Sequence, residues 1–367
     1  MPRASLCQVH DATRAGTEVA APDRYKKIMV IPKNQSRSSP RFSTIRAVLA
    51  HDCPTPCMAS AGAGNAAPAR SGMTMPLCAI DDEEGERVDP ALPAVIDAHV
   101  HLFPPGVFEA IWRWFDRYGW PIRYKLHARE VVRFLLSRGV ERIVALHYAH
   151  KPGMARALNA FMAELVRDEP RVTGLATVFP GEDGAVDILR DAFAAGLAGV
   201  KLHCHVQAMA PDDPSLHDVY ATCQAEGRVV VIHAGREPRS DALPRDPRDF
   251  CDAGRVDAVL RAFPRLRLCV PHLGADEFGA YAALLEKHDN LWLDTTMVLA
   301  DYFAVPSPRF VLDVRPERIL YGTDFPNLPY AWDRELRRVA GARLSDARLE
   351  TLLSGAARAL YGLQPPS

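Results

Sequence analysis

Two histidines spaced two residues apart, His99 and His101, lie at the end of a short run of β-forming residues, 96–102. Side chains alternate across a strand, so the two imidazoles are expected to point to the same side. Two neutral imidazoles that converge from one strand can chelate a transition metal such as zinc. The same spacing also fits coincidence or two hydrogen-bonded core histidines, so the pair needs support from the rest of the chain.

Residues with the same chemistry recur at the ends of other strand-like runs. Six of the thirteen histidines lie at such ends, whereas random placement would scatter them among helices and loops. Together with one carboxylate, that of Asp324, their ring nitrogens make a ligand set for a divalent metal if the strand ends converge. The six histidines are His99, His101, His203, His205, His233 and His272.

This convergence requires strands whose carboxyl ends meet at one face. From residue 94 onward, continuously apolar runs alternate with amphipathic stretches, as expected for parallel strands buried on both faces. Eight such runs over roughly 270 residues predict an α/β fold, a (β/α)8 TIM barrel, whose active site lies at the carboxyl ends of the strands. The predicted strands span residues 94–102, 142–147, 172–179, 199–205, 228–234, 267–272, 291–295 and 318–323.

A doubly wound open sheet is the second candidate for the fold. It shares the alternation of strand and helix, and it also gathers its sites at the carboxyl ends of the strands. The stretch after the first predicted strand has no glycine-rich phosphate loop, which disfavours this alternative.

Residues 1–90 differ in composition from the rest of the chain. They have almost no periodic apolar pattern, and the first 75 residues hold ten basic and four acidic residues. Such a segment cannot bury enough apolar surface to offset the entropy of ordering, so we predict a disordered N-terminal extension before a barrel domain at 91–367. The extension is either a targeting segment or, as we favour, a mis-assigned start, with translation beginning at Met73 or Met75.

Composition limits the classes of partner. The formal net charge of -1 argues against nucleic acid or an anionic membrane as the main partner. No run approaches the ~18 consecutive apolar residues that a membrane helix needs. The eight cysteines are scattered, as expected for reduced thiols in a cytoplasmic enzyme. A small-molecule substrate is therefore the expected partner.

Five phrases at the strand ends resemble the amidohydrolase superfamily. They carry its order of HxH, His, His and Asp on strands one, five, six and eight. The chain resembles in particular the amidohydrolase-related (amidohydrolase 2) family of predicted metal-dependent TIM-barrel hydrolases, a branch that also includes decarboxylases and lactonases. The resemblance covers residues 94–361. The phrases are Asp-Ala-His-Val-His (97–101), Gly-Val-Lys-Leu-His (199–203), Val-Ile-His-Ala-Gly (231–235), His-Leu-Gly (272–274) and Leu-Tyr-Gly-Thr-Asp-Phe-Pro (320–326).

The resemblance implies a role for each member of the ligand set. His99, His101, His233 and Asp324 would bind a divalent metal, with Zn²⁺ as the expected ion and a second ion as an alternative. Asp324 would also act as the general base. His272 would be a ligand in a two-metal site; in a one-metal site it would orient the attacking water or polarise a substrate carbonyl.

Four further residues are candidates for supporting roles, Lys201 from the same resemblance and Asp97 and Arg236 from their positions in the sequence. Lys201 would either be carboxylated and bridge two metals, or contact a substrate carboxylate through its charge. His203 is a further candidate for bridging or substrate binding. Arg236 either clamps an acidic substrate or is an ordinary surface charge. Asp97 is expected to form a hydrogen bond behind the metal ligands.

Two reactions are open on such a site. The leading prediction is a hydrolase that cleaves an amide, ester or lactone bond of a small acidic or aromatic substrate through metal-bound hydroxide. The alternative is a metal-dependent non-oxidative decarboxylase, or a hydratase, of an unsaturated or aromatic carboxylic acid. His99 stands where some decarboxylases of this branch have glutamate, which favours hydrolysis without deciding the question. A homodimer is expected by analogy with related barrels.

Overall fold

Eight short parallel strands form the centre of the fold in the computed structural model, which describes residues 81–237, 242–302 and 307–364. Regular ladders join β1–β2–β3 and β4–β5–β6–β7–β8. The strands are β1 Ile96–His101, β2 Arg142–Leu146, β3 Val172–Gly174, β4 Gly199–His203, β5 Val229–His233, β6 Arg267–Val270, β7 Leu291–Asp294 and β8 Ile319–Leu320.

Two single-residue contacts close the sheet into a barrel. Ala176 pairs with Val200 between β3 and β4, and Val100 pairs with Phe325 between β1 and the segment after β8. Because the first and last strands are joined in this way, the predicted (β/α)8 barrel is confirmed. Each strand also lies within or close to its predicted range.

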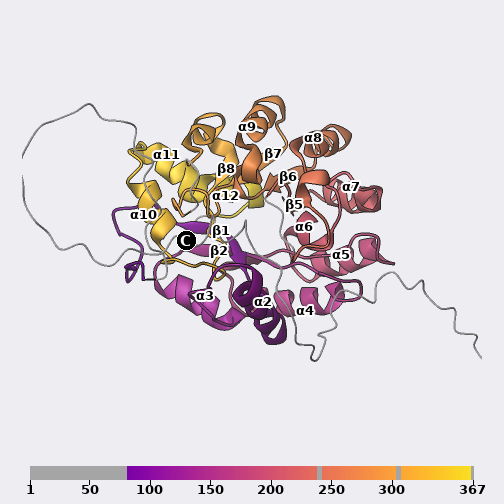
Figure 1. The fold of residues 1–367 in the computed structure, drawn as a ribbon, viewed down its shortest axis with the longest axis horizontal. Helices are drawn as coiled ribbons and strands as arrows, with labels where there is room; N and C mark the ends of the chain where they lie inside the picture. The colour runs from indigo at the N-terminus through magenta and orange to yellow at the C-terminus, as the bar shows by residue number, and fades with distance from the viewer. Residues whose placement is uncertain (1–80, 238–241, 303–306, 365–367) are drawn as a thin grey trace, which may run out of the picture. The chain divides into compact units, whose positions relative to one another are not determined.

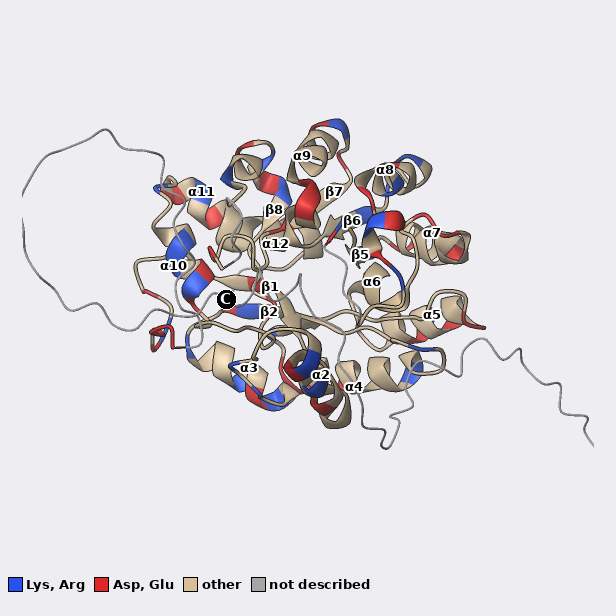
Figure 2. Ribbon diagram, viewed as in Figure 1, with Lys and Arg blue, Asp and Glu red and all other residues tan. Residues whose placement is uncertain are grey.

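Helices surround the strands as an outer ring (Figure 1). On these helices, positions of Lys and Arg are interspersed with positions of Asp and Glu (Figure 2). None of the helices within the described ranges has the length and apolar character needed to span a bilayer. The helices are α2 Pro105–Tyr118, α3 Ala128–Ser137, α4 Ala155–Asp168, α5 Ala185–Ala194, α6 Cys204–Gln207, α7 His217–Ala225, α8 Ala253–Ala262, α9 Phe278–Lys287, α10 Arg334–Ala340, α11 Asp346–Glu350 and α12 Ala356–Tyr361, with a π-helical turn at Thr351–Gly355.

Apolar side chains pack on both faces of the strands. Val200 and Leu202 of β4 belong to the larger core, which also includes residues of the surrounding helices. Because side chains alternate along a strand, Lys201 between them faces the barrel interior. There its side chain is fully buried.

The fourth predicted strand is two residues too long. β4 ends at His203, and the chain turns directly into the short helix α6. The side-chain oxygen of Gln207 accepts the backbone N–H of His203 at 2.8 Å, a local side-chain-to-backbone bond that favours the turn. His205 therefore lies on a helix and not at the end of a strand.

The predicted N-terminal extension lies mostly outside the described residues. Its last ten residues, 81–90, are described, and they contact the barrel. Gly85 N donates to Asp333 Oδ2 at 3.0 Å, and Val88 N donates to Arg138 O at 2.7 Å. The contacts with the barrel thus begin before the predicted boundary at residue 91.

Candidate metal centre

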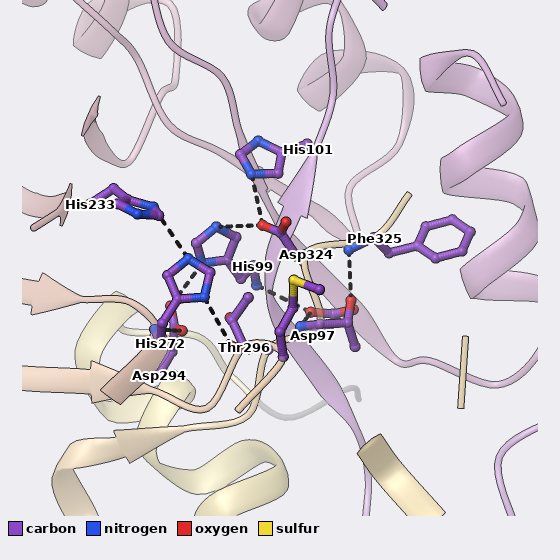
Figure 3. Close-up of polar contacts among 12 residues, drawn as sticks. Asp97, His99, His101, His233, His272, Asp294, Thr296, Asp324 and Phe325 are labelled. Carbon is purple, nitrogen blue, oxygen red and sulfur yellow. Dashed lines mark hydrogen bonds and ion pairs between the residues drawn. The ribbon is translucent and has the colours of Figure 1, made fainter. Parts of the chain in front are cut away.

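His99, His101 and Asp324 bring three ligand atoms together at the carboxyl end of the barrel (Figure 3). Asp324 Oδ1 lies 3.0 Å from His101 Nε2 and 3.4 Å from His99 Nε2. All three ligand atoms lie within 4.8 Å of one another. Two imidazole nitrogens and one carboxylate oxygen are a donor set that suits zinc and its neighbouring divalent ions.

The seam between β8 and β1 fixes these three side chains. Asp324 N donates to His99 O at 2.9 Å, and His101 N donates to Phe325 O at 2.8 Å. Asp324 adopts a φ of 76°, a left-handed conformation that non-glycine residues rarely take. The surrounding hydrogen bonds hold this conformation, as is common at functional sites.

Asp97 joins the two sides of the seam, because its side chain accepts hydrogen bonds from β1 and from the segment after β8. Its carboxylate accepts the hydroxyl of Thr323 at 2.6 Å, the backbone N–H of Thr323 at 3.1 Å and that of His99 at 3.2 Å. The hydrogen bond predicted behind the ligands is therefore made to the backbone of His99 and not to an imidazole.

Asp294, at the end of β7, determines which nitrogen of His99 is free. Asp294 Oδ2 lies 2.9 Å from His99 Nδ1 and can only accept when ionised, so the Nδ1 proton is donated to it. A neutral His99 then has a lone pair on Nε2, which is buried and has no hydrogen-bond partner among the described residues. Two acceptors, His99 Nε2 and Asp324 Oδ1, thus face each other. A cation between them would satisfy both, so the residues fit a metal ion.

The charge states of the three residues also suit a metal. Burial, reinforced by the nearby charge of Lys201, holds the pKa of His99 well below its usual range, so the ring is neutral at pH 7. Burial alone would raise the pKa of Asp324, but its contact with His101 more than offsets this effect and holds the pKa below its ordinary value. Asp324 is therefore an anion next to a neutral nitrogen ligand.

His272 and His233 contact each other beside the triad formed by His99, His101 and Asp324. His272 Nε2 lies 3.2 Å from His233 Nδ1, and its Nδ1 lies 3.0 Å from Thr296 O (Figure 3). The His272 ring centre is 5.7 Å from that of His99. The ring nitrogens of His233 lie closer to those of His203 and His205 than to the three atoms of the triad. Its predicted role as a ligand of the triad metal therefore stays a prediction.

That other set contains His203 and His205. Their ligand atoms and that of His233 lie within 4.8 Å of one another. Glu237 lies against the same group, with its carboxylate 2.8 Å from His233 Nε2 and 3.2 Å from His205 Nδ1. The group lies where β4 and β5 end, next to the triad.

The two predicted cationic residues lie in different surroundings. Lys201 is fully buried, its Nζ has no hydrogen-bond partner within the described part of the chain, and burial lowers its pKa to about 8. It lies close enough to Asp294 and Asp324 for their charges to influence it. Arg236 is half exposed and lies 3.8 Å from Glu277, as expected of a surface charge.

Sequence reasoning gave Asp294 no role in the site and missed Glu237. Asp294 carried a usable signal, because it ends the seventh predicted strand and so had to reach the same barrel face. Glu237 lies in a loop four residues after His233, where strand periodicity gives no information.

The sequence profile of the family described as Amidohydrolase matches residues 96–363. A 2-amino-3-carboxymuconate-6-semialdehyde decarboxylase of Dictyostelium discoideum is 25% identical over 247 residues, which cover 58% of this chain and 67% of the relative.

Solved structures share the fold. An uncharacterised TIM-barrel protein of Bordetella bronchiseptica aligns over 73% of this chain and 98% of its own, at 19% identity and a TM-score of 0.57. A 5-carboxyvanillate decarboxylase of Novosphingobium aromaticivorans, in complex with manganese and 4-hydroxy-3-methoxy-5-nitrobenzoic acid, aligns over 76% and 99%, at 15% identity and a TM-score of 0.53. At these identities the likeness concerns the barrel alone.

Proposed function

The chain belongs to the amidohydrolase family, and from this premise we propose that it is a metal-dependent, non-oxidative decarboxylase of a small unsaturated or aromatic carboxylic acid. The observation that carries the proposal is the buried donor set of His99, His101 and Asp324, in which His99 Nε2 has no hydrogen-bond partner among the described residues. Zinc stays the predicted ion, and manganese is an alternative because the donor set suits several divalent metals.

The name of the sequence relative supports decarboxylation over hydrolysis, which reverses the order expected from the sequence. We assign Asp324 to metal binding, because its carboxylate oxygen Oδ1 lies 3.0 Å from His101 Nε2 and 3.4 Å from His99 Nε2.

A metal held by His99, His101 and Asp324 would supply a positive centre that binds substrate oxygens and stabilises negative charge. His272 is the residue that we propose to transfer the proton. Its Nδ1 donates to Thr296 O, so Nε2, which lies 3.2 Å from His233 Nδ1, is the nitrogen that would exchange a proton with the substrate. Protonation of the carbon that carries the carboxylate, followed by cleavage of the bond between them, releases carbon dioxide and leaves a new C–H bond.

Lys201 would compensate the charge of an acidic substrate. Its buried amine has no hydrogen-bond partner among the described residues, and a substrate carboxylate near it would gain a strong electrostatic interaction at low dielectric. This role needs no carboxylated lysine and is compatible with a single metal in the triad.

Carbon dioxide release from a panel of unsaturated and hydroxylated aromatic acids tests the proposal. In deuterium oxide the product should carry deuterium at the carbon that lost the carboxylate, and a chelator should abolish turnover. Hydrolysis is the second candidate because the first strand carries His99 and His101. Turnover of lactones, esters or amides without carbon dioxide release would establish hydrolysis and refute decarboxylation.

A further inference from the structure

Tyr148 lies beside the triad at the carboxyl end of the barrel, two residues after the end of β2. Its ring centre is 5.9 Å from that of His101 and 4.8 Å from that of His203, so the ring stands between the ends of β1 and β4. The side chain is half-buried, whereas both neighbours in the chain, His147 and Ala149, are fully buried. Tyr148 therefore keeps accessible surface next to a candidate metal ligand, where a bound substrate would lie.

The hydroxyl of Tyr148 is available to such a substrate. No hydrogen-bond partner contacts it among the residues that the structure describes. Burial, and after it the negative charge of Asp324, raises the pKa of Tyr148, so the phenol stays protonated at neutral pH and can donate. An oxygen of a ligand bound at the triad is an acceptor within the surroundings of this hydroxyl.

Aromatic rings pack around Tyr148 on more than one side. The Phe103 ring centre is 5.2 Å away with the two ring planes at 80°, and the His203 ring lies at 72° to that of Tyr148. Edge-to-face contacts of this kind are favourable and restrict the orientation of the rings. A site walled by flat rings favours a planar, unsaturated ligand over a bulky aliphatic one.

The side chain of Gln207 joins the backbone next to Tyr148 to that of His203. Its amide nitrogen donates to Ala149 O and to Val178 O, both at 2.9 Å, and its amide oxygen accepts His203 N at 2.8 Å. The side chain is buried, so these bonds are shielded from competition by water. Because one amide fixes both backbones, it also sets the position of the Tyr148 ring relative to the His203 ring.

We propose that Tyr148 is a substrate-binding residue whose hydroxyl donates a hydrogen bond to an oxygen of a planar acid at the triad, and that Gln207 positions Tyr148 for this contact. The inference rests on the proposed function, because it takes the ligand to be the unsaturated or aromatic acid of the decarboxylase. It adds the residue that selects a planar acid and the residue that supports it.

Binding of salicylate, a planar acid, to zinc-loaded full-length protein tests the contact. Isothermal titration calorimetry should give a Kd for Tyr148→Phe at least ~10-fold above the wild type, the effect of losing one hydrogen bond to a charged ligand. Zinc content should be unchanged. Cyclohexanecarboxylate has the same charge but is not flat, and it should bind the wild type at least ~10-fold more weakly than salicylate. Tyr118→Phe, at a 41% exposed side chain, is the matched control and should bind like the wild type.

A double-variant comparison tests the role of Gln207. Gln207→Met keeps a similar volume but loses the three hydrogen bonds, and it should also raise the Kd for salicylate. In the Tyr148→Phe protein the same change should have little further effect, because a positioning residue acts through the residue that it positions. Asn290→Leu removes a buried amide at the amino end of β7, which donates to Leu260 O and Phe263 O, and should leave the Kd unchanged.

Three outcomes would overturn the proposal. Equal salicylate affinity in the wild type and Tyr148→Phe would refute the contact, and failure of the zinc-loaded wild type to bind salicylate would refute the ligand class. Additive effects of the two variants would show that Gln207 does not act through Tyr148. Thermal melting checks folding, and Tyr148→Phe alone decides the contact if Gln207→Met unfolds. Salicylate binding requires no turnover, so these outcomes are separate from the carbon dioxide release that tests the proposed function.

Discussion

Asp294 Oδ2 accepts the Nδ1 proton of His99 at 2.9 Å, and Asp294 Oδ1 accepts the backbone N–H of His272 at 3.2 Å. One carboxylate at the end of β7 thus orients a candidate metal ligand of β1 and a residue after β6. It fixes the His99 tautomer, and through it the availability of Nε2 for a metal.

Asp294→Asn should therefore weaken metal binding without removing a ligand. The asparagine amide can donate to His99 Nδ1, which would move the ring proton to Nε2 and block it. We expect a ~10–100-fold loss of Zn²⁺ affinity, measured by competition with a chelator of known affinity. Asp218→Asn, at an 84% exposed side chain, is the matched control. Unchanged affinity in Asp294→Asn would refute the role in orientation.

Asp324→Asn should lose turnover while the barrel stays folded. The amide oxygen is a weaker ligand than a carboxylate, and the variant cannot balance the charge of the metal. We expect kcat to fall at least ~100-fold, with a thermal midpoint within a few degrees of the wild type for metal-free protein. Rates close to wild type in the metal-loaded variant would exclude Asp324 from the site.

Lys201→Met should raise KM for an acidic substrate more than it lowers kcat. Methionine fills a similar buried volume but has no charge, and the amine forms no hydrogen bond to the described residues that would be lost. We expect an increase in KM of at least ~10-fold, with metal content unchanged. Lys151→Met, in an exposed turn, controls for general loss of charge. If metal content falls to half, Lys201 is instead a bridge between two ions.

The barrel and the triad could be predicted because each strand can be recognised from the residues of that strand alone. Apolar runs such as 228–234 identify buried strands, and barrel closure makes the first and last strands neighbours. Once eight strands are counted, His99 and His101 on strand one must therefore lie beside Asp324 after strand eight. No alignment is needed for that step.

The orientation of individual rings could not be predicted in the same way. Whether the His233 ring contacts the triad or Glu237 depends on side-chain torsions and on His272, which strand periodicity does not report. The early end of β4 coincides with one hydrogen bond, which His203 N donates to the side-chain oxygen of Gln207, four residues farther along the chain. Contacts of this kind form at or beyond the ends of the strands, where the alternation of apolar residues no longer predicts the direction of a side chain.

Protein stability should fall below about pH 6.5, in part because of His147, whose ordinary pKa lies there. His147 is fully buried at the end of β2, and its Nε2 donates to Asn159 Oδ1 at 3.2 Å. Asn159 Oδ1 also accepts Thr177 N, so the orientation of this amide is fixed. His147 Nδ1 has no hydrogen-bond partner in the described ranges, and a proton placed there would be buried.

Burial lowers the pKa of His147 to about 3, although its contact with Asn159 opposes the shift. Between that value and about 6.5, the unfolded chain binds a proton that the folded chain does not, so stability is lost as the pH falls. One such histidine lowers the free energy of unfolding by ~1.4 kcal/mol for each pH unit of acidification in this range. His147→Gln should reduce the slope of the unfolding free energy between pH 6 and pH 5 by about that amount, measured by urea titration of metal-free protein. An identical slope in His147→Gln and the exposed-site control His217→Gln would contradict the argument.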